Sequence, residues 1–239
     1  MARKGSSPWL TLLMILGIGL LLVMLLLPAT RPVRTVSLQT QCMNNLKQIG
    51  LALYNYMDRY QAFPPAYTVD ASGKPLHSWR TLIAIELGSN NLYDKIDLTK
   101  PWDHPANAEA YASMPHPFQC PASVGAPNHT QYLAIVAPSG FIQPTKPHPL
   151  SEITDGLQNT MIVIEVPGDQ AVHWMSPQDA SEEQVSSIGP KSKLAHNGGM
   201  NALFCAGNVS FLKADMPAAE RLAIISIAGG DNPSEEPAN

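Results

Sequence analysis

A stretch of 19 uncharged residues near the N-terminus constrains this chain most. Residues 9–27 read WLTLLMILGIGLLLVMLLL, which as a helix is about 28 Å long, close to the hydrocarbon thickness of a bilayer. A removed signal peptide would have an apolar region of about 7 to 15 residues followed by a small-residue cleavage site. This run is longer, and Pro28, Ala29 and Thr30 make a poor cleavage site. The sequence therefore predicts a single-pass transmembrane helix at 9–27, preceded by a short N-terminus at 1–8, and leaves open which side of the membrane each end occupies.

The composition excludes some classes of protein. The chain has 15 basic and 19 acidic residues and a formal charge of −4, which argues against a nucleic-acid partner because such proteins need a basic surface. Charged residues make up 14% of the chain and there are 22 prolines, which favours a loop-rich fold over a helical bundle. A hydrophobic content of 45% supplies enough apolar side chains for a core.

A second helix is predicted after the apolar run. Apolar or half-apolar residues recur at steps of three or four, which places them on one helical face: Leu38, Cys42, Leu46, Ile49, Leu53, Tyr56 and Tyr60. We expect this face to pack on the core of a domain. The helix should end before Pro64 and Pro65.

The remainder of the chain alternates short helical and strand-like segments. Short helices are expected at 78–87, 106–114 and 216–228, with a polar, mobile insertion at 178–194 and a disordered acidic tail at 231–239. Segments rich in β-branched and aromatic residues predict strands at 131–136, 161–166, 201–205 and 208–212. The last two are joined by Ala206 and Gly207, which is typical of a hairpin.

Several stretches resemble one family in the same order along the chain. They are LLLPATRPVRTVSLQTQCMNNLKQIGLALYNYMDRYQAFPPAY, GKPLHSWRTLI, LYDKIDLTKPWDHPAN, FQCPAS, ITDGLQNTMIVIEV and HNGGMNALFCAGNVSFL. The sequence is similar to planctomycete-type proteins of unknown function that carry a prepilin-like N-terminal helix. The resemblance implies an α+β fold in which a transmembrane helix continues into a long amphipathic helix packed on an antiparallel sheet. It also implies that the pilin-like domain, residues 28–230, faces away from the cytoplasm, and therefore that residues 1–8 form a short cytoplasmic N-terminus.

Two departures from the family pattern bear on function. Gly5 is followed by Ser6, Ser7, Pro8 and Trp9 in place of Phe-Thr-Leu, and no glutamate occurs before Glu86. In prepilin-like proteins the peptidase cuts after that glycine and the glutamate helps to register subunits. We therefore expect neither prepilin cleavage nor pilus assembly.

The orientation that the resemblance implies favours a disulfide between Cys42 and Cys120. Cys42 lies on the apolar face of the second helix, and an extracytoplasmic compartment permits the bond. The alternative is two free buried thiols that act as small apolar side chains. Cys205 is expected to be an unpaired core residue.

Catalytic and metal sites are not expected. The seven histidines show neither an HExxH motif nor a helical pair with metal-ligand spacing. A hydrolase would combine His196 and Asp155 with a serine, but no GxSxG motif is present and both residues lie in turn-like sequence. No cofactor is predicted.

The predicted function is association with other proteins. We expect a non-enzymatic, single-pass protein of the cytoplasmic membrane whose domain meets other envelope proteins. A tethered module that binds a small solute or glycan is the alternative, since Trp79, Trp102 and Trp174 could line a groove, although core packing is the commoner use of tryptophan. An envelope hydrolase is the third possibility.

Overall fold

A computed structural model describes residues 8–26, 30–123, 125–146 and 148–230 of the chain. The predicted cytoplasmic terminus, up to residue 7, and the predicted tail at 231–239 lie outside these residues. The chain divides into two compact units, Met1–Gln39 and Thr40–Asn239, and each is considered by itself.

The N-terminal apolar stretch forms helix α1 (Pro8–Leu26). Among the described residues, no helix combines the length and the apolar character that crossing a bilayer requires. The prediction of a transmembrane helix at 9–27 is therefore wrong.

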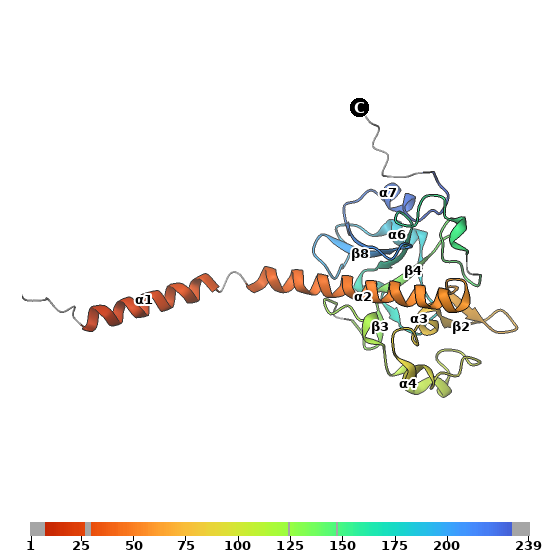
Figure 1. Cartoon of the computed structure of the whole chain (residues 1–239), viewed down its shortest axis with the longest axis horizontal. Helices are drawn as coiled ribbons and strands as arrows, with labels where there is room; N and C mark the ends of the chain where they lie inside the picture. Colours follow the sequence, from red (N-terminus) through yellow and green to blue (C-terminus); the bar gives the residue numbers. More distant parts are fainter. Residues whose placement is uncertain (1–7, 27–29, 124, 147, 231–239) are drawn as a thin grey trace, which may run out of the picture. The chain divides into compact units, whose positions relative to one another are not determined.

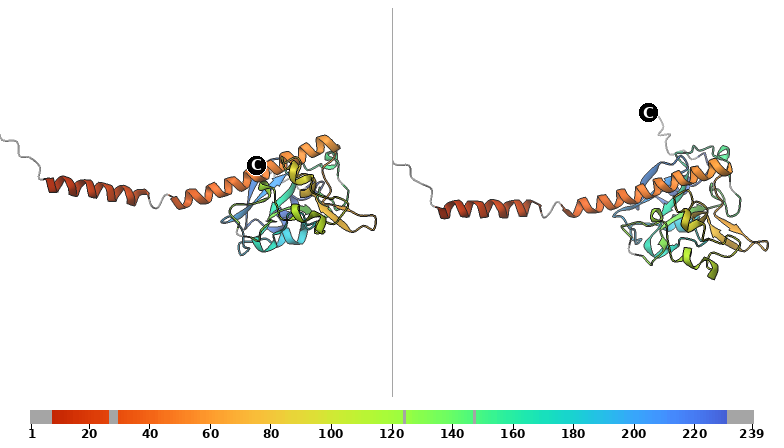
Figure 2. Two further views of the ribbon diagram at one scale, coloured as in Figure 1. Left: turned by 90° about the horizontal axis from the view of Figure 1, so that it is seen from below. Right: turned by 60° about the horizontal axis from the view of Figure 1, so that its bottom comes forward.

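Helix α2 (Thr30–Tyr60) contains the predicted amphipathic segment. Cys42, Leu46, Ile49 and Leu53 are fully buried in the core, as the period of the sequence predicts. The helix ends where Gln61 takes a left-handed conformation, φ 59°, a common way to terminate a helix. Beyond Thr40, α2 lies along one side of the sheet, which Figures 1 and 2 show from several directions.

The main sheet has five strands in the order β7-β4-β5-β8-β9. They are β4 (Tyr132–Val136), β5 (Met161–Glu165), β7 (Ala180–Ser181), β8 (Gly199–Phe204) and β9 (Val209–Lys213). The four predicted strands and the predicted hairpin are confirmed. The prediction of a purely antiparallel sheet is wrong, because β7 pairs with β4 in parallel, Ile135 opposite Ala180. The fold is α+β with a mixed sheet.

Each face of the sheet has its own apolar core. Side chains alternate between the faces of a strand, so Tyr132 and Ala134 join the core shared with α2, and Leu133 and Ile135 join the other. The second core is closed by α6 (Glu182–Ser187) and α7 (Ala218–Ala223), which neighbour each other in Figure 1. The segment 178–194, expected to be a mobile insertion, thus contains a strand and a helix.

Short elements connect and cover these layers. The helices are α3 (Trp79–Leu82), α4 (Asn90–Tyr93) and α5 (Ala108–Tyr111), and the 3₁₀ turns are Pro105–Asn107, His116–Phe118, Leu150–Glu152 and Gly168–Gln170. Two small antiparallel sheets pair β1 (Tyr67–Val69) with β2 (Pro75–Ser78) and β3 (His129–Thr130) with β6 (Val172–His173). The predicted helices at 78–87, 106–114 and 216–228 are therefore shorter than expected, because turns take up their ends.

A buried ion pair ties this covering layer to the sheet. Arg80 is fully buried, and its Nη1 donates to Asp179 Oδ1 at 2.6 Å. The same carboxylate oxygen accepts the indole N–H of Trp79 and the backbone N–H of Ala134 in β4. Three donors thus converge on Asp179 Oδ1, whereas Asp179 Oδ2 is buried without a hydrogen-bond partner in the part of the chain that the structure describes.

Candidate functional site

The candidate site lies at one edge of the main sheet, where β9 is the edge strand. In the described residues β9 pairs with β8 alone. The N–H of Phe204 in β8 donates to the carbonyl oxygen of Asn208, and the N–H of Ala214 donates to that of Gly198. Asn208 and Ala214, the residues on either side of β9, therefore bond inward toward β8. Residues of an antiparallel strand bond alternately to either side. The backbone groups of Val209, Phe211 and Lys213 therefore face the open edge.

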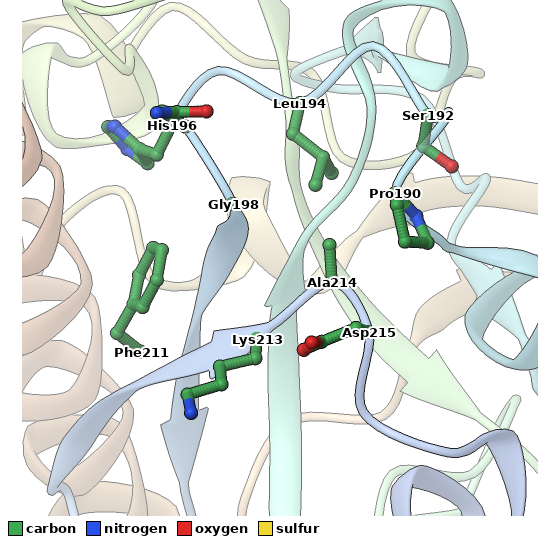
Figure 3. A pocket seen from close by; sticks show the side chains of 10 residues that line it. Pro190, Ser192, Leu194, His196, Gly198, Phe211, Lys213, Ala214 and Asp215 are labelled. Carbon is green, nitrogen blue, oxygen red and sulfur yellow. The ribbon is translucent and has the colours of Figure 1, made fainter.

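A cavity of about 940 Å³ adjoins the C-terminal end of this edge, within the size range of ligand pockets. Figure 3 shows side chains from β9 and from the loop before β8 around it. Its lining residues are Pro190, Ser192, Leu194, His196, Asn197, Gly198, Phe211, Lys213, Ala214 and Asp215. The wall combines apolar surface with one basic and one acidic side chain at the end of β9.

Gly199 in β8 permits the position of the Phe211 ring in the cavity wall. A Cβ atom at this glycine would lie 2.2 Å from the backbone oxygen of Leu212 and 2.6 Å from the Phe211 ring. Real Cβ atoms do not approach so closely, so only glycine fits. The hairpin then turns at Gly207, whose φ of 85° also suits glycine.

His196 lies between the cavity and a group of buried side chains that includes Glu165 and Cys120. It lines the cavity, yet it is only 7% exposed. Its Nε2 lies 3.2 Å from Glu165 Oε2 and 3.8 Å from Cys120 Sγ. The same Glu165 oxygen accepts hydrogen bonds from the backbone N–H and the side-chain amide of Asn201. The other oxygen, Glu165 Oε1, is buried and has no partner.

The predicted disulfide is confirmed: Cys42 and Cys120 are bonded, with Cα atoms 5.1 Å apart. It joins α2 to the segment after the 3₁₀ turn at His116–Phe118 and lies beside His196. Cys205 is a buried free thiol, as expected. Burial raises the pKa of this thiol to about 12, so it stays protonated and unreactive at neutral pH.

Other residues considered from the sequence do not converge here. Trp79 and Trp174 are 1% and 0% exposed and belong to the core, whereas Trp102 stacks on Tyr111. Asp155 accepts hydrogen bonds from the backbone of Gly229 and Gly230. The structure therefore does not bring Asp155 to His196.

A separate cluster of rings surrounds His173. The imidazole stacks on Tyr111 with centroids 3.9 Å apart, and Trp102 and His129 also pack against it. Burial lowers the pKa of His173 to about 4, so the ring is neutral at pH 7. This cluster is a packing feature that holds α5 on β6.

Sequence reasoning missed Glu165, Asn201 and the open edge. A signal existed for Glu165, because it is a carboxylate inside the otherwise apolar strand MIVIEV, and a buried charge needs a partner. The partners come from residues 31 or more positions away, so no local pattern reveals them.

The family comparison covers the first part of this site. Residues 33–138 match the model of a family described as a protein of unknown function, DUF1559. Over that stretch the chain is similar to DUF1559 proteins. The match spans less than half of the 239 residues; it includes both disulfide cysteines, whereas Glu165, His196 and β9 lie outside it. No curated protein and no solved structure matches the chain.

Proposed function

We propose that this protein binds other proteins of the cell envelope without catalysing a reaction, and that it does so at the open edge of β9. The observation that carries the proposal is the position of this edge next to the 940 Å³ cavity. An extended partner segment can add a strand to such an edge, with backbone hydrogen bonds for affinity and a side-chain pocket for specificity.

The arrangement fits strand addition in two respects. The backbone of Val209, Phe211 and Lys213 supplies three positions with outward-facing donors and acceptors. The cavity continues from Phe211 to Asp215, so a side chain of the added strand would enter it. Lys213 and Asp215, both exposed, would contact polar side chains beside that anchor.

The domain is proposed to work outside the cytoplasm. Disulfides persist in oxidising compartments and are rare in the cytosol, and the Cys42–Cys120 bond closes a separation of 78 residues. Both cysteines of this bond lie within residues 33–138, the stretch that is similar to DUF1559 proteins.

A pilin-like architecture is proposed as well. The inner face of α2 supports it, because it shares one core with β4, β5 and β8, three neighbouring strands of the mixed sheet. The sequence after Gly5, Ser-Ser-Pro-Trp, lacks the prepilin cleavage pattern. We therefore propose a role in association that does not depend on prepilin processing.

The test compares two substitutions at one position of the edge. Lys213→Pro removes the outward N–H and blocks strand addition, whereas Lys213→Ala removes the charge and keeps the N–H. A photo-crosslinking residue placed at Phe211 in the native envelope should join this protein to a discrete partner. The crosslink should persist in Lys213→Ala and disappear in Lys213→Pro.

A crosslinker at Glu220, exposed on α7, is the matched control and should not yield the same product. Loss of the product in both Lys213 variants would instead assign recognition to the charge. Equal yields from Phe211 and Glu220, or a product unaffected by proline, would overturn the proposal. A small molecule retained in the cavity of the purified protein, with no protein crosslink, would favour the solute-binding alternative.

A further inference from the structure

We infer that the Cys42–Cys120 disulfide covers a metal site, and that the reduced protein binds one Zn²⁺ through Cys42, Cys120, His196 and Glu165. Each of these residues offers one ligand atom, and the four atoms all lie within 4.8 Å of one another. All four side chains are buried. They come from four segments: α2, the loop after His116–Phe118, the end of β5 and the loop before β8.

The set of ligand types suits zinc. Zn²⁺ is bound in proteins by thiolate, imidazole and carboxylate ligands at about 2.0 to 2.3 Å, most often in tetrahedral geometry. In a regular tetrahedron of that size the ligand atoms are roughly 3.3 to 3.8 Å apart. The Glu165 Oε2 to His196 Nε2 distance of 3.2 Å and the His196 Nε2 to Cys120 Sγ distance of 3.8 Å already match this spacing. The sulfur atoms would have to separate once their bond is broken, which rotation of the cysteine side chains can supply.

The carboxylate gives an independent reason to expect a ligand. Glu165 is 1% exposed, and its Oε1 is buried without a hydrogen-bond partner. A buried carboxylate with one oxygen unpaired is unfavourable, and a cation bound at Oε2 would compensate its charge. The two hydrogen bonds from Asn201 to Oε2 hold the carboxylate in place, as groups behind metal ligands commonly do.

Access to the site exists from two directions. Cys120 lines a hollow of about 440 Å³ together with Gln119, Ser123 and Gln131. His196 lines the larger cavity next to β9. A hydrated ion or a small reductant can therefore approach either end of the cluster.

The chemistry requires a reductant, which we assign to the class of dithiols. The dithiol is oxidised to its own disulfide while two electrons and two protons convert the Cys42–Cys120 bond to two thiols. Zn²⁺ binding then displaces the two thiol protons to solvent, because thiolate is the ligand form. In the oxidised protein only His196 and Glu165 can coordinate, so the disulfide and the metal site exclude each other.

The experiment measures metal binding in the two redox states. Purified protein, oxidised or reduced with a phosphine that does not bind zinc, is titrated with Zn²⁺, and with Co²⁺ as a spectroscopic probe. The reduced protein should bind one equivalent, with tetrahedral ligand-field bands and a thiolate-to-cobalt charge-transfer band. The oxidised protein should bind on the order of 100-fold more weakly or not at all.

Variants that retain both cysteines identify the other ligands. Glu165→Gln and His196→Gln are checked for the native disulfide and fold by circular dichroism before reduction. Each should weaken binding by the reduced protein by on the order of 100-fold, with altered cobalt bands. Asp155→Asn and Cys205→Ser change a carboxylate and a thiol outside the cluster and should bind like the wild type.

Three results would overturn the inference: no stoichiometric binding by the reduced protein, equal binding by both redox states, or unchanged binding in both Glu165→Gln and His196→Gln. If the reduced apoprotein is unfolded, Zn²⁺ should restore its circular dichroism spectrum. Failure to do so counts equally against the inference.

Discussion

At the scale of single residues, His173 shows how burial sets the charge of a side chain. Both ring nitrogens are already used by the neutral form: Nε2 lies 3.0 Å from the carbonyl oxygen of Tyr111, and Nδ1 accepts the N–H of Met175 at 3.3 Å. Protonation at Nδ1 would remove the second bond and place a charge among aromatic rings. The low pKa of His173, about 4, follows from burial first, with the nearby His129 and Arg80 acting in the same direction.

This pKa predicts a loss of stability in acid. A histidine whose pKa is depressed in the folded state stabilises the protein above its unfolded pKa of 6.5, and that contribution is lost as pH falls from about 6.5 to about 4. The free energy of unfolding should therefore decrease over this interval by at most about 3 kcal/mol through His173 alone. Denaturant titrations at several pH values give the free energy of unfolding of the wild type and of His173→Gln. The contribution of His173 is the difference between the two proteins in the slope of this free energy against pH.

His104→Gln, which changes an exposed histidine, is the control and should keep the wild-type slope. If His173→Gln retains the full pH dependence between 4 and 6.5, the interpretation of the ring cluster is wrong. Carboxylates that titrate in the same interval affect all three proteins alike and cancel in the comparison.

At the scale of elements, the β8–β9 hairpin depends on close approach at Gly199. Gly199→Ala places a methyl group against the Leu212 backbone oxygen and the Phe211 ring. Relief requires a shift of the strands, and overpacking of this kind costs about 1 to 3 kcal/mol. Thermal or urea unfolding should show that loss, accompanied by weaker crosslinking from the β9 edge. Gly189→Ala, where a Cβ meets nothing within 4 Å, should be close to neutral, and an equally neutral Gly199→Ala would contradict the close approach.

The elements also show how far sequence alone predicts this fold. Strands β4, β5, β8 and β9 and the buried face of α2 follow from local period and propensity, which the amino acids carry themselves. The parallel pairing of β7 does not, because a strand of two residues has no period and is positioned by contacts with β4 and α6. The sequence predicts the short helices to be longer than they are, because the turns that flank them are set by tertiary hydrogen bonds. One of these runs from the N–H of Trp79 to the carbonyl oxygen of Ala66.

The candidate site is likewise predictable from the sequence only in part. The pairing of Cys42 with Cys120 was predicted because a cysteine on the buried helix face and an extracytoplasmic location both favoured it. The approach of His196 and Glu165 to that disulfide was not, since it depends on how the end of β5 meets the loop before β8. Apolar alternation in a strand predicts burial, but it does not say which polar groups share the buried space.

At the scale of the whole molecule, the disulfide is the largest single constraint on the unfolded chain. It closes a separation of 78 residues, and the chain-entropy model gives about 4 to 5 kcal/mol for a loop of that size. A domain's net stability is about 5 to 15 kcal/mol, so Cys42→Ala/Cys120→Ala should lower the urea midpoint strongly or prevent folding at 37 °C.

Cys205→Ala tests whether loss of any buried sulfur has the same effect. It removes packing alone and should cost about 1 to 2 kcal/mol, and it should leave the response to reductant unchanged. A double variant no less stable than Cys205→Ala would show that the folded core, not the covalent link, holds α2 against the sheet.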